Sequence, residues 1–131
     1  MDESAINLPE VLAEVTAVFR QYEQAFLVND TGTLNDLFWN SQLTVRFGIA
    51  EMQYGAESIY LWREHWRPSA PLARSLRNLV IKTFGDSFAT ADVEFLRDNE
   101  PVGRQSQVWV KFPQGWRVVS AHVSMLETQV V

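Results

Sequence analysis

Hydrophobic residues near the start of the chain recur every three or four positions, the spacing of one face of an amphipathic helix. The residues on this face are Val11, Leu12, Val15, Val18, Phe19, Tyr22 and Phe26. Asn7, Pro9 and Glu10 predict the helix start: asparagine accepts a bond from an N-terminal amide, proline suits the first turn, and a glutamate three residues on completes a capping box. The turn residues 30–32 predict its end near Asn29.

The pattern then changes from helix to strand. A short second helix is predicted over residues 34–39, with Thr33 as its cap. Over residues 43–49 hydrophobic residues alternate with others, which is the period of a β-strand. This alternation puts Arg46 on the more polar face of that strand, and a further short strand is predicted over residues 52–54.

A third helix is predicted over residues 56–66, and Pro68 and Pro71 should stop it. Its repeating face holds Ile59, Trp62, Arg63 and Trp66. The remainder of the chain predicts four long strands, near residues 74–84, 88–97, 103–112 and 116–126.

Short turns separate these strands, so consecutive ones should pair antiparallel. Helices first and strands afterwards indicate an α+β fold, with a curved antiparallel sheet wrapped around the N-terminal helices. No linker, repeat or low-complexity tract divides the chain, so residues 1–131 are expected to form a single domain.

Composition narrows the possible partners. The net charge is −5 and no run of lysine and arginine offsets it, which disfavours binding to nucleic acid. The chain has no cysteine, no signal-peptide pattern and no apolar run near the roughly 20 residues of a membrane helix. We therefore expect a cytoplasmic protein without a membrane partner.

The common catalytic signatures are absent: there is no GxGxxG, P-loop, GxSxG or HExxH sequence. The two histidines, His65 and His122, lie on different predicted elements without a metal-ligand pattern. We expect neither a metal nor another cofactor.

Tyr22 and Arg46 are the first candidates for a site. Tyr22 puts one hydroxyl on an apolar helical face, where it is either a core residue or a donor aimed into a cavity. Arg46 is either a solvated arginine or a carboxylate clamp, because guanidinium bonds both oxygens of a carboxylate. Periodicity alone favours the core reading of Tyr22 and leaves Arg46 open, since it does not orient the faces of a strand.

Aromatic and amide side chains supply further candidates. Gln105, Gln107 and Trp109 share one strand face and resemble a surface for a planar polar ligand, although an outer or dimer-facing surface is the more common role of such a face. Trp62 and Trp66, with His65 between them, form either a lid over a cavity or part of the core.

Three other titratable residues are candidates for acid–base chemistry. Asp92 and Glu94 alternate onto one strand face, where they are either solvated or the catalytic carboxylates of an isomerase-type pocket. His122 lies within a strand, either as a general base or as an ordinary sheet residue.

Three strings carry a resemblance that covers nearly the whole chain. They are TVRFGIAEMQYG (residues 44–55), IKTFGDSFATA (81–91) and GRQSQVWVKFPQGWRVVSAHVS (103–124). With the helix-first order, they resemble the nuclear transport factor two-like superfamily, whose domains are cone-shaped, and within it the small AtzH- and HpxZ-like proteins. In that group the first-helix tyrosine and the arginine of the RFG segment are functional, and they correspond to Tyr22 and Arg46.

The resemblance implies an amidohydrolase that converts 1,3-dicarboxyurea to allophanate in cyanuric acid catabolism, by a hydrolytic or a decarboxylating route. It also implies a homo-oligomer that meets through one sheet face, and a functional link to a neighbouring amidase. A tyrosine side chain, with a reference pKa of about 10, suits donation better than proton abstraction. The alternative function is a non-catalytic accessory or assembly domain, because a fold does not fix an activity.

Overall fold

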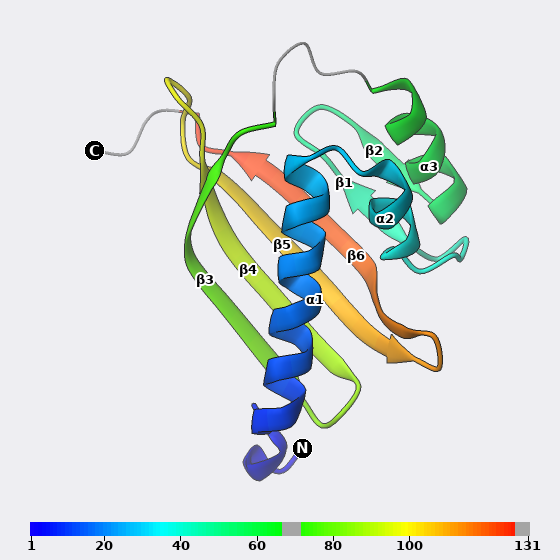
Figure 1. Ribbon diagram of the computed structural model, residues 1–131, viewed down its shortest axis with the longest axis vertical. Coiled ribbons are helices and arrows are strands. Elements are labelled where there is room, and N and C mark those ends of the chain that lie inside the picture. Colours follow the sequence, from blue (N-terminus) through cyan, green and yellow to red (C-terminus); the bar gives the residue numbers. More distant parts are fainter. Residues whose placement is uncertain (67–71, 128–131) are drawn as a thin grey trace.

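A computed structural model describes residues 1–66 and 72–127 of the chain (Figure 1). The helices are a 3₁₀ turn at Glu3–Ala5, α1 (Pro9–Leu27), α2 (Thr31–Asp36) and α3 (Ala56–His65). The strands are β1 (Val45–Phe47), β2 (Met52–Tyr54), β3 (Ser75–Phe84), β4 (Phe88–Leu96), β5 (Gly103–Phe112) and β6 (Gly115–Met125). Among the described residues, no helix is long and apolar enough to span a membrane.

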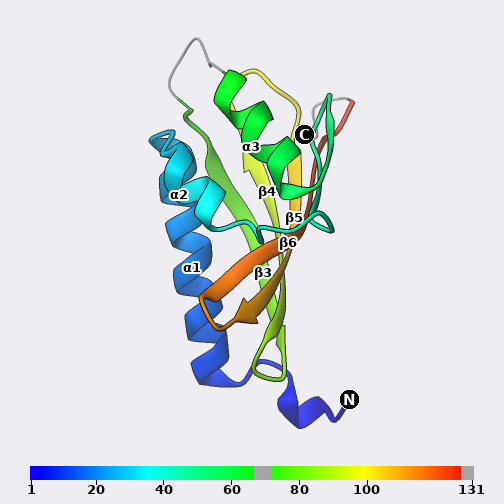
Figure 2. The ribbon, with the colours of Figure 1, turned by 90° about the vertical axis from the view of Figure 1, so that its right-hand side faces the viewer.

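The strands form one curved sheet in the order β2-β1-β6-β5-β4-β3. The four long strands make an antiparallel meander, as their short turns predict. β1 joins the far edge of β6 in parallel, and β2 pairs antiparallel with β1. The helices lie on one side of this sheet, with α1 running along the inside of its curve (Figure 2). The predicted α+β fold, helices first and a curved sheet around them, is confirmed.

The bounds of the long strands agree with the sequence pattern to within one or two residues. The predicted strand over 43–49 is shorter, however, because only Val45–Phe47 pairs with neighbours. Leu43 and Ile49 lie outside it and are exposed. Pro68 and Pro71, which were predicted to stop α3, lie outside the described residues.

Asn7 does not cap α1, contrary to the prediction. The cap position is Leu8, without a side-chain bond, while Pro9 occupies the first turn as expected. The side-chain oxygen of Asn7 instead accepts from the backbone N–H of Thr83 on β3, at 2.9 Å. The residue therefore fastens the chain before α1 to the sheet.

The cap of α2 was also assigned to the wrong residue. The side chain of Asp30 accepts from the N–H of Thr33 at 3.1 Å and from its hydroxyl at 2.7 Å. The helix consequently begins at Thr31 and ends at Asp36, earlier than the predicted span of 34–39. Aspartate was the better cap candidate, because its carboxylate accepts two bonds at once.

The core lies between α1 and the inner face of the sheet. Its most deeply buried side chains are Val15, Phe19, Leu34, Phe38, Ile59, Phe95, Trp109 and Val118. Two irregularities curve the sheet around this core, one in β3 between Arg77 and Val80 and one where β5 meets β6 after Val108. α3 lies beside β2, toward the C-terminal end of α1 (Figure 1).

Candidate functional site

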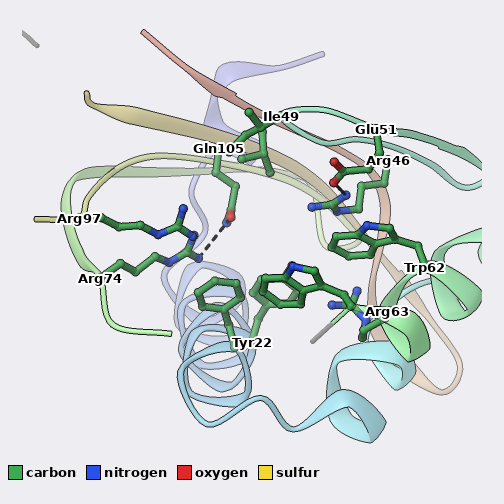
Figure 3. A pocket seen from close by; sticks show the side chains of 12 residues that line it. Tyr22, Arg46, Ile49, Glu51, Trp62, Arg63, Arg74, Arg97 and Gln105 are labelled. Atoms are coloured by element: carbon green, nitrogen blue, oxygen red, sulfur yellow. Dashed lines mark hydrogen bonds and ion pairs between the residues drawn. The ribbon is translucent and has the colours of Figure 1, made fainter. Parts of the chain in front are cut away.

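A cavity of about 290 Å³ lies between α1, α3 and the inner face of the sheet (Figure 3). Its polar lining consists of Tyr22, Arg46, Glu51, Arg63, Arg74, Arg97 and Gln105. Its apolar lining consists of Phe26, Ile49, Trp62, Trp66 and Val123. Four of the 11 basic residues of an acidic chain therefore surround one cavity.

Arg46 reaches the cavity from β1. Its Nη1 donates to the carboxylate of Glu51 at 2.9 Å and to the side-chain oxygen of Gln53 at 3.1 Å. The guanidinium carbon lies 4.2 Å from the centre of the Trp62 ring, a cation–π contact. Contacts from β2, from the turn before it and from α3 thus hold the Arg46 side chain toward the cavity.

Tyr22 enters the cavity from α1, as Figure 3 shows. Its ring is buried, with 6% of the residue exposed, and packs edge-on against Trp109 with centroids 6.2 Å apart. No described residue forms a hydrogen bond to its hydroxyl. The ring therefore belongs to the core, whereas the hydroxyl is available to a bound molecule.

Arg63 is the most unusual charge at the site. It is 3% exposed, its Nε donates to the side-chain oxygen of Asn35 at 2.8 Å, and its Nη2 is buried without a partner. No described carboxylate forms an ion pair with it. Burial lowers the pKa of this guanidinium, and the nearby charge of Arg46 lowers it further to a smaller extent. A buried cation without an anion is costly, so this end of the cavity favours a negatively charged guest.

Arg74 lies on the opposite side of the cavity, immediately before β3. Its Nε and Nη2 donate to both carboxylate oxygens of Glu23, at 3.0 and 2.7 Å. Its guanidinium carbon lies 3.9 Å from the centre of the Phe26 ring. This buried ion pair joins α1 to a segment 51 residues away in the chain.

Arg97 and Gln105 complete this side. Arg97 follows β4 at the rim, with 30% of its side chain exposed and Glu100 at 3.9 Å. Gln105 lies on β5, where its oxygen accepts from Arg74 at 3.3 Å while its Nε2 is buried without a partner.

Trp62 and Trp66 both line the cavity, as the lid hypothesis predicts, and their rings stack 5.6 Å apart. His65, between them in the sequence, does not line this cavity; it is exposed, and its Nδ1 lies 2.8 Å from the backbone oxygen of Leu61.

Gln107 and Trp109 were grouped with Gln105 on one strand face, for which an outer surface was the more common role. That assignment is wrong, because all three are buried on the face toward α1. Only Gln105 lines the cavity. Gln107 and Trp109 lie deeper in the core, where the indole N–H of Trp109 donates to the Gln107 oxygen at 3.1 Å. Their contact with the site is indirect, through the Tyr22 ring.

The other titratable candidates lie away from the cavity. Asp92 accepts from Ser106 at 2.7 Å and has Lys82 at 3.7 Å, while Glu94 pairs with Arg77 at 2.9 Å. These contacts are on the outer face of the sheet, so the isomerase-type reading of the two carboxylates is wrong. His122 is also exposed there, against the ring of Phe47.

Arg63, Arg74, Arg97 and Glu23 were not selected from the sequence. Two of them carried a usable signal, because a charged residue on an apolar helical face is expected to have a buried role. Glu23 lies between Phe19 and Phe26 on α1, and Arg63 follows Ile59 by one turn on α3. Arg74 and Arg97 carried none, since arginines at strand ends are usually solvated.

Within residues 1–66 and 72–127, no three histidine, aspartate or glutamate side chains are grouped to hold a metal ion. The polar groups at the cavity are mainly donors: guanidinium nitrogens, an amide and a phenol. Such a lining suits a small anion, above all a carboxylate, which accepts several bonds at once.

Fold and site together define a class. The structure is similar to a nuclear transport factor two-like protein from Salmonella enterica serovar Typhimurium, with 25% identity, a TM-score of 0.73, and coverage of 93% of this chain and 95% of the other. It is closer to a cystatin-like fold protein from Burkholderia xenovorans, at 45% identity and a TM-score of 0.88, over 94% of this chain and 97% of that one. The chain thus has the nuclear transport factor two-like, or cystatin-like, fold.

Within that class, the AtzH-like family model matches residues 4–129, and the chain belongs to this family. A protein of unknown function from Pectobacterium atrosepticum is 48% identical, with a TM-score of 0.93 over 97% of this chain and 99% of the other. No protein among the curated sequences compared with the chain matches it. Family membership suggests a role related to that of AtzH.

Proposed function

We propose that the protein is a small amidohydrolase that removes one carboxylate from 1,3-dicarboxyurea and releases allophanate. The observation that carries this proposal is the pairing of Tyr22 and Arg46 at one cavity, beside a buried Arg63 that has no carboxylate partner. The family match adds support, because the resemblance to AtzH-like proteins is what implies this activity.

In the proposed complex, Arg46 and Arg63 bind a carboxylate of the substrate. Glu51 fixes the direction of Arg46, and the Trp62 ring packed against its guanidinium holds the arginine in place. The Tyr22 hydroxyl donates to the carbonyl or to the departing nitrogen, where negative charge develops.

The bond that breaks joins a urea nitrogen to a carboxylate carbon. In the decarboxylating route its electron pair stays on the nitrogen, which takes a proton, and carbon dioxide leaves. In the hydrolytic route water adds to the carboxylate carbon and bicarbonate leaves. The first route needs a proton donor but no base, and Tyr22 suits it; in the second, Glu51 is the cavity carboxylate that would accept a proton from water.

The test is to follow purified protein with 1,3-dicarboxyurea labelled with carbon-13 in its carboxylates. We expect allophanate to form faster than in a protein-free control, which is required because N-carboxylates also lose carbon dioxide unaided. A pH indicator read without carbonic anhydrase separates the routes by whether carbon dioxide or bicarbonate appears first. A rate equal to that of the control would reject the enzyme and favour the accessory domain. Faster turnover that requires the neighbouring amidase would also favour the accessory domain.

A further inference from the structure

We infer that the cavity has a second carboxylate subsite, formed by Arg74, Arg97 and Gln105, and that it selects ligands with a carboxylate at each end. This inference rests on the proposed function and deepens it, since it assigns the residues that bind the second carboxylate of a dicarboxylated ligand. The second subsite lies across the cavity from Arg46 and Arg63, with Tyr22 entering between the two groups (Figure 3).

Arg74 is held rigidly before any ligand arrives. The carboxylate of Glu23 accepts from its Nε and Nη2, and its guanidinium carbon lies 3.9 and 4.9 Å from the ring centres of Phe26 and Phe95. Only 2% of the side chain is exposed. Its Nη1 forms no hydrogen bond to a described residue. A donor fixed in this way costs little conformational entropy when a ligand binds.

Gln105 supplies an unfilled donor beside it. Because Arg74 can only donate, the Gln105 oxygen has to face it, which directs the amide nitrogen elsewhere. That nitrogen is buried without a partner, on a residue that is 5% exposed. A buried N–H left unpaired destabilises the empty cavity, and an accepting ligand oxygen would remove that cost.

Arg97 brings a second positive charge to the rim of this side. Burial lowers the pKa of Arg97, and the charge of Arg74 lowers it further. Two guanidinium groups that repel each other on the same side of the cavity favour an anion beside both of them. Arg97 also has an ion-pair partner, the carboxylate of Glu100 at 3.9 Å.

Net charge alone does not define the subsite, since Glu23 and Glu51 offset Arg74 and Arg46. The subsite is defined by hydrogen-bond donors that have no partner in the described part of the chain. Arg63 Nη2 is unpaired at one end of the cavity and Gln105 Nε2 at the other. A ligand with one acceptor group at each end can pair with both donors.

The test compares glutarate with pentanoate, which has a methyl group in place of one carboxylate. Neither carries an N-carboxylate, so binding is measured apart from turnover, by calorimetry and by tryptophan fluorescence. We expect the wild-type protein to bind glutarate about tenfold or more tightly than pentanoate, the effect of one charge-assisted contact. Gln105→Leu and Arg97→Gln should each weaken glutarate binding severalfold and leave pentanoate binding unchanged.

Arg104→Gln is the matched control. It removes one positive charge from the same strand, but from an exposed residue on the outer face that donates to Ser124. It should change neither affinity. Thermal unfolding checks each variant, and Arg97→Gln, at the rim, keeps the test valid if Gln105→Leu does not fold.

Equal wild-type affinity for the two ligands would overturn the subsite, as would equal losses for both ligands in the variants. The outcome is separate from that of the proposed function. Selectivity for glutarate without turnover of dicarboxyurea keeps the subsite and rejects the enzyme, whereas turnover without selectivity does the reverse.

Discussion

Single residues at the site combine a packing role with a hydrogen-bonding group that has no partner among the described residues. Tyr22 packs its ring against Trp109 and Phe38, and Arg63 fixes one nitrogen on Asn35 and leaves another unpaired. At both positions, a substitution can keep the packing and remove only the hydrogen-bonding group.

Tyr22→Phe should lower kcat for dicarboxyurea by about 10²- to 10⁴-fold if the hydroxyl delivers or polarises a proton. The free energy of unfolding should change by less than about 1 kcal/mol, because no described residue bonds that hydroxyl. Carbon-13 NMR and thermal unfolding measure the two effects. Tyr60→Phe is the control, since Tyr60 does not line this cavity. Full activity in Tyr22→Phe would contradict the assigned role.

Arg63→Met should weaken ligand binding without weakening the fold. Replacing a buried, unpaired charge by an apolar side chain of similar volume is often neutral or stabilising. The loss of one charged donor, about 1.5–3 kcal/mol, corresponds to roughly ten- to a hundredfold in affinity for glutarate. Calorimetry and chemical denaturation measure both quantities. If the variant is less stable than the wild-type protein and its folded form binds glutarate with unchanged affinity, Arg63 has only a structural role.

At the scale of elements, the β4–β5 pair supports the second subsite. Phe95 on β4 lies opposite Gly103 on β5, and a side chain at Gly103 would overlap the Phe95 ring. The same ring contacts Arg74 and Arg97. A glycine covered by a cross-strand aromatic ring thus sets the position of both arginines.

Gly103→Ala should destabilise the protein by about 1–3 kcal/mol, the usual cost of overpacking. It should also weaken glutarate binding, because the Phe95 ring has to move. Gly32→Ala is the control: the nearest atom to an added Cβ there is a side-chain oxygen of Asp30 at 3.7 Å, an ordinary contact. Chemical denaturation of both variants is the measurement, and equal stabilities would refute the packing argument.

Glu14 joins α1 to the β5–β6 hairpin. It accepts from Lys111 at 2.7 Å and from the Trp116 indole at 2.9 Å, and these bonds lower its pKa from the reference value of 4.5. A carboxylate with a lowered folded-state pKa adds stability above its unfolded pKa and loses it as the pH falls through the folded value.

Glu14→Gln should therefore melt below the wild-type protein at pH 7, and the difference should vanish as the pH is lowered below about 4. Melting temperatures across a pH series provide the measurement. A difference that stays constant with pH would mean that the charge of Glu14 contributes nothing.

At the scale of the whole molecule, none of the described helices covers the outer face of the sheet (Figure 2). Val80 and Phe88 on this face are 50% and 41% exposed. We propose that two copies of the protein meet through it, by a symmetric contact.

Light scattering should then give a mass of twice 15.0 kDa. Phe88→Glu should shift the protein toward monomer, because a buried unpaired charge opposes the contact. Leu61→Glu, at an exposed residue of α3, should leave the dimer intact. A monomeric wild-type protein at high concentration would reject the proposal.

The sequence alone determined the elements. Apolar spacing of three and four residues located α1 and α3, and alternation located the long strands to within one or two residues. Local chemistry is sufficient for this, because the period of a helix or strand is a property of neighbouring residues. Tyr22 and Arg46 were also selected from the sequence, each as a single departure from its pattern that the family resemblance supported.

Only the tertiary structure decided which strand face meets α1 and which distant residues meet at the cavity. Alternation in β5 separates Gln105 from Arg104 but does not say which of them meets α1, and the wrong face was favoured. Packing decided it, since Trp109 on the same face as Gln105 fills the core beneath Tyr22. The meeting of Glu23 with Arg74, 51 residues apart, and of four arginines at one cavity depends on the closure of the whole sheet around α1. No local pattern encodes that closure, because it follows from the free energy of burying all the inner faces together.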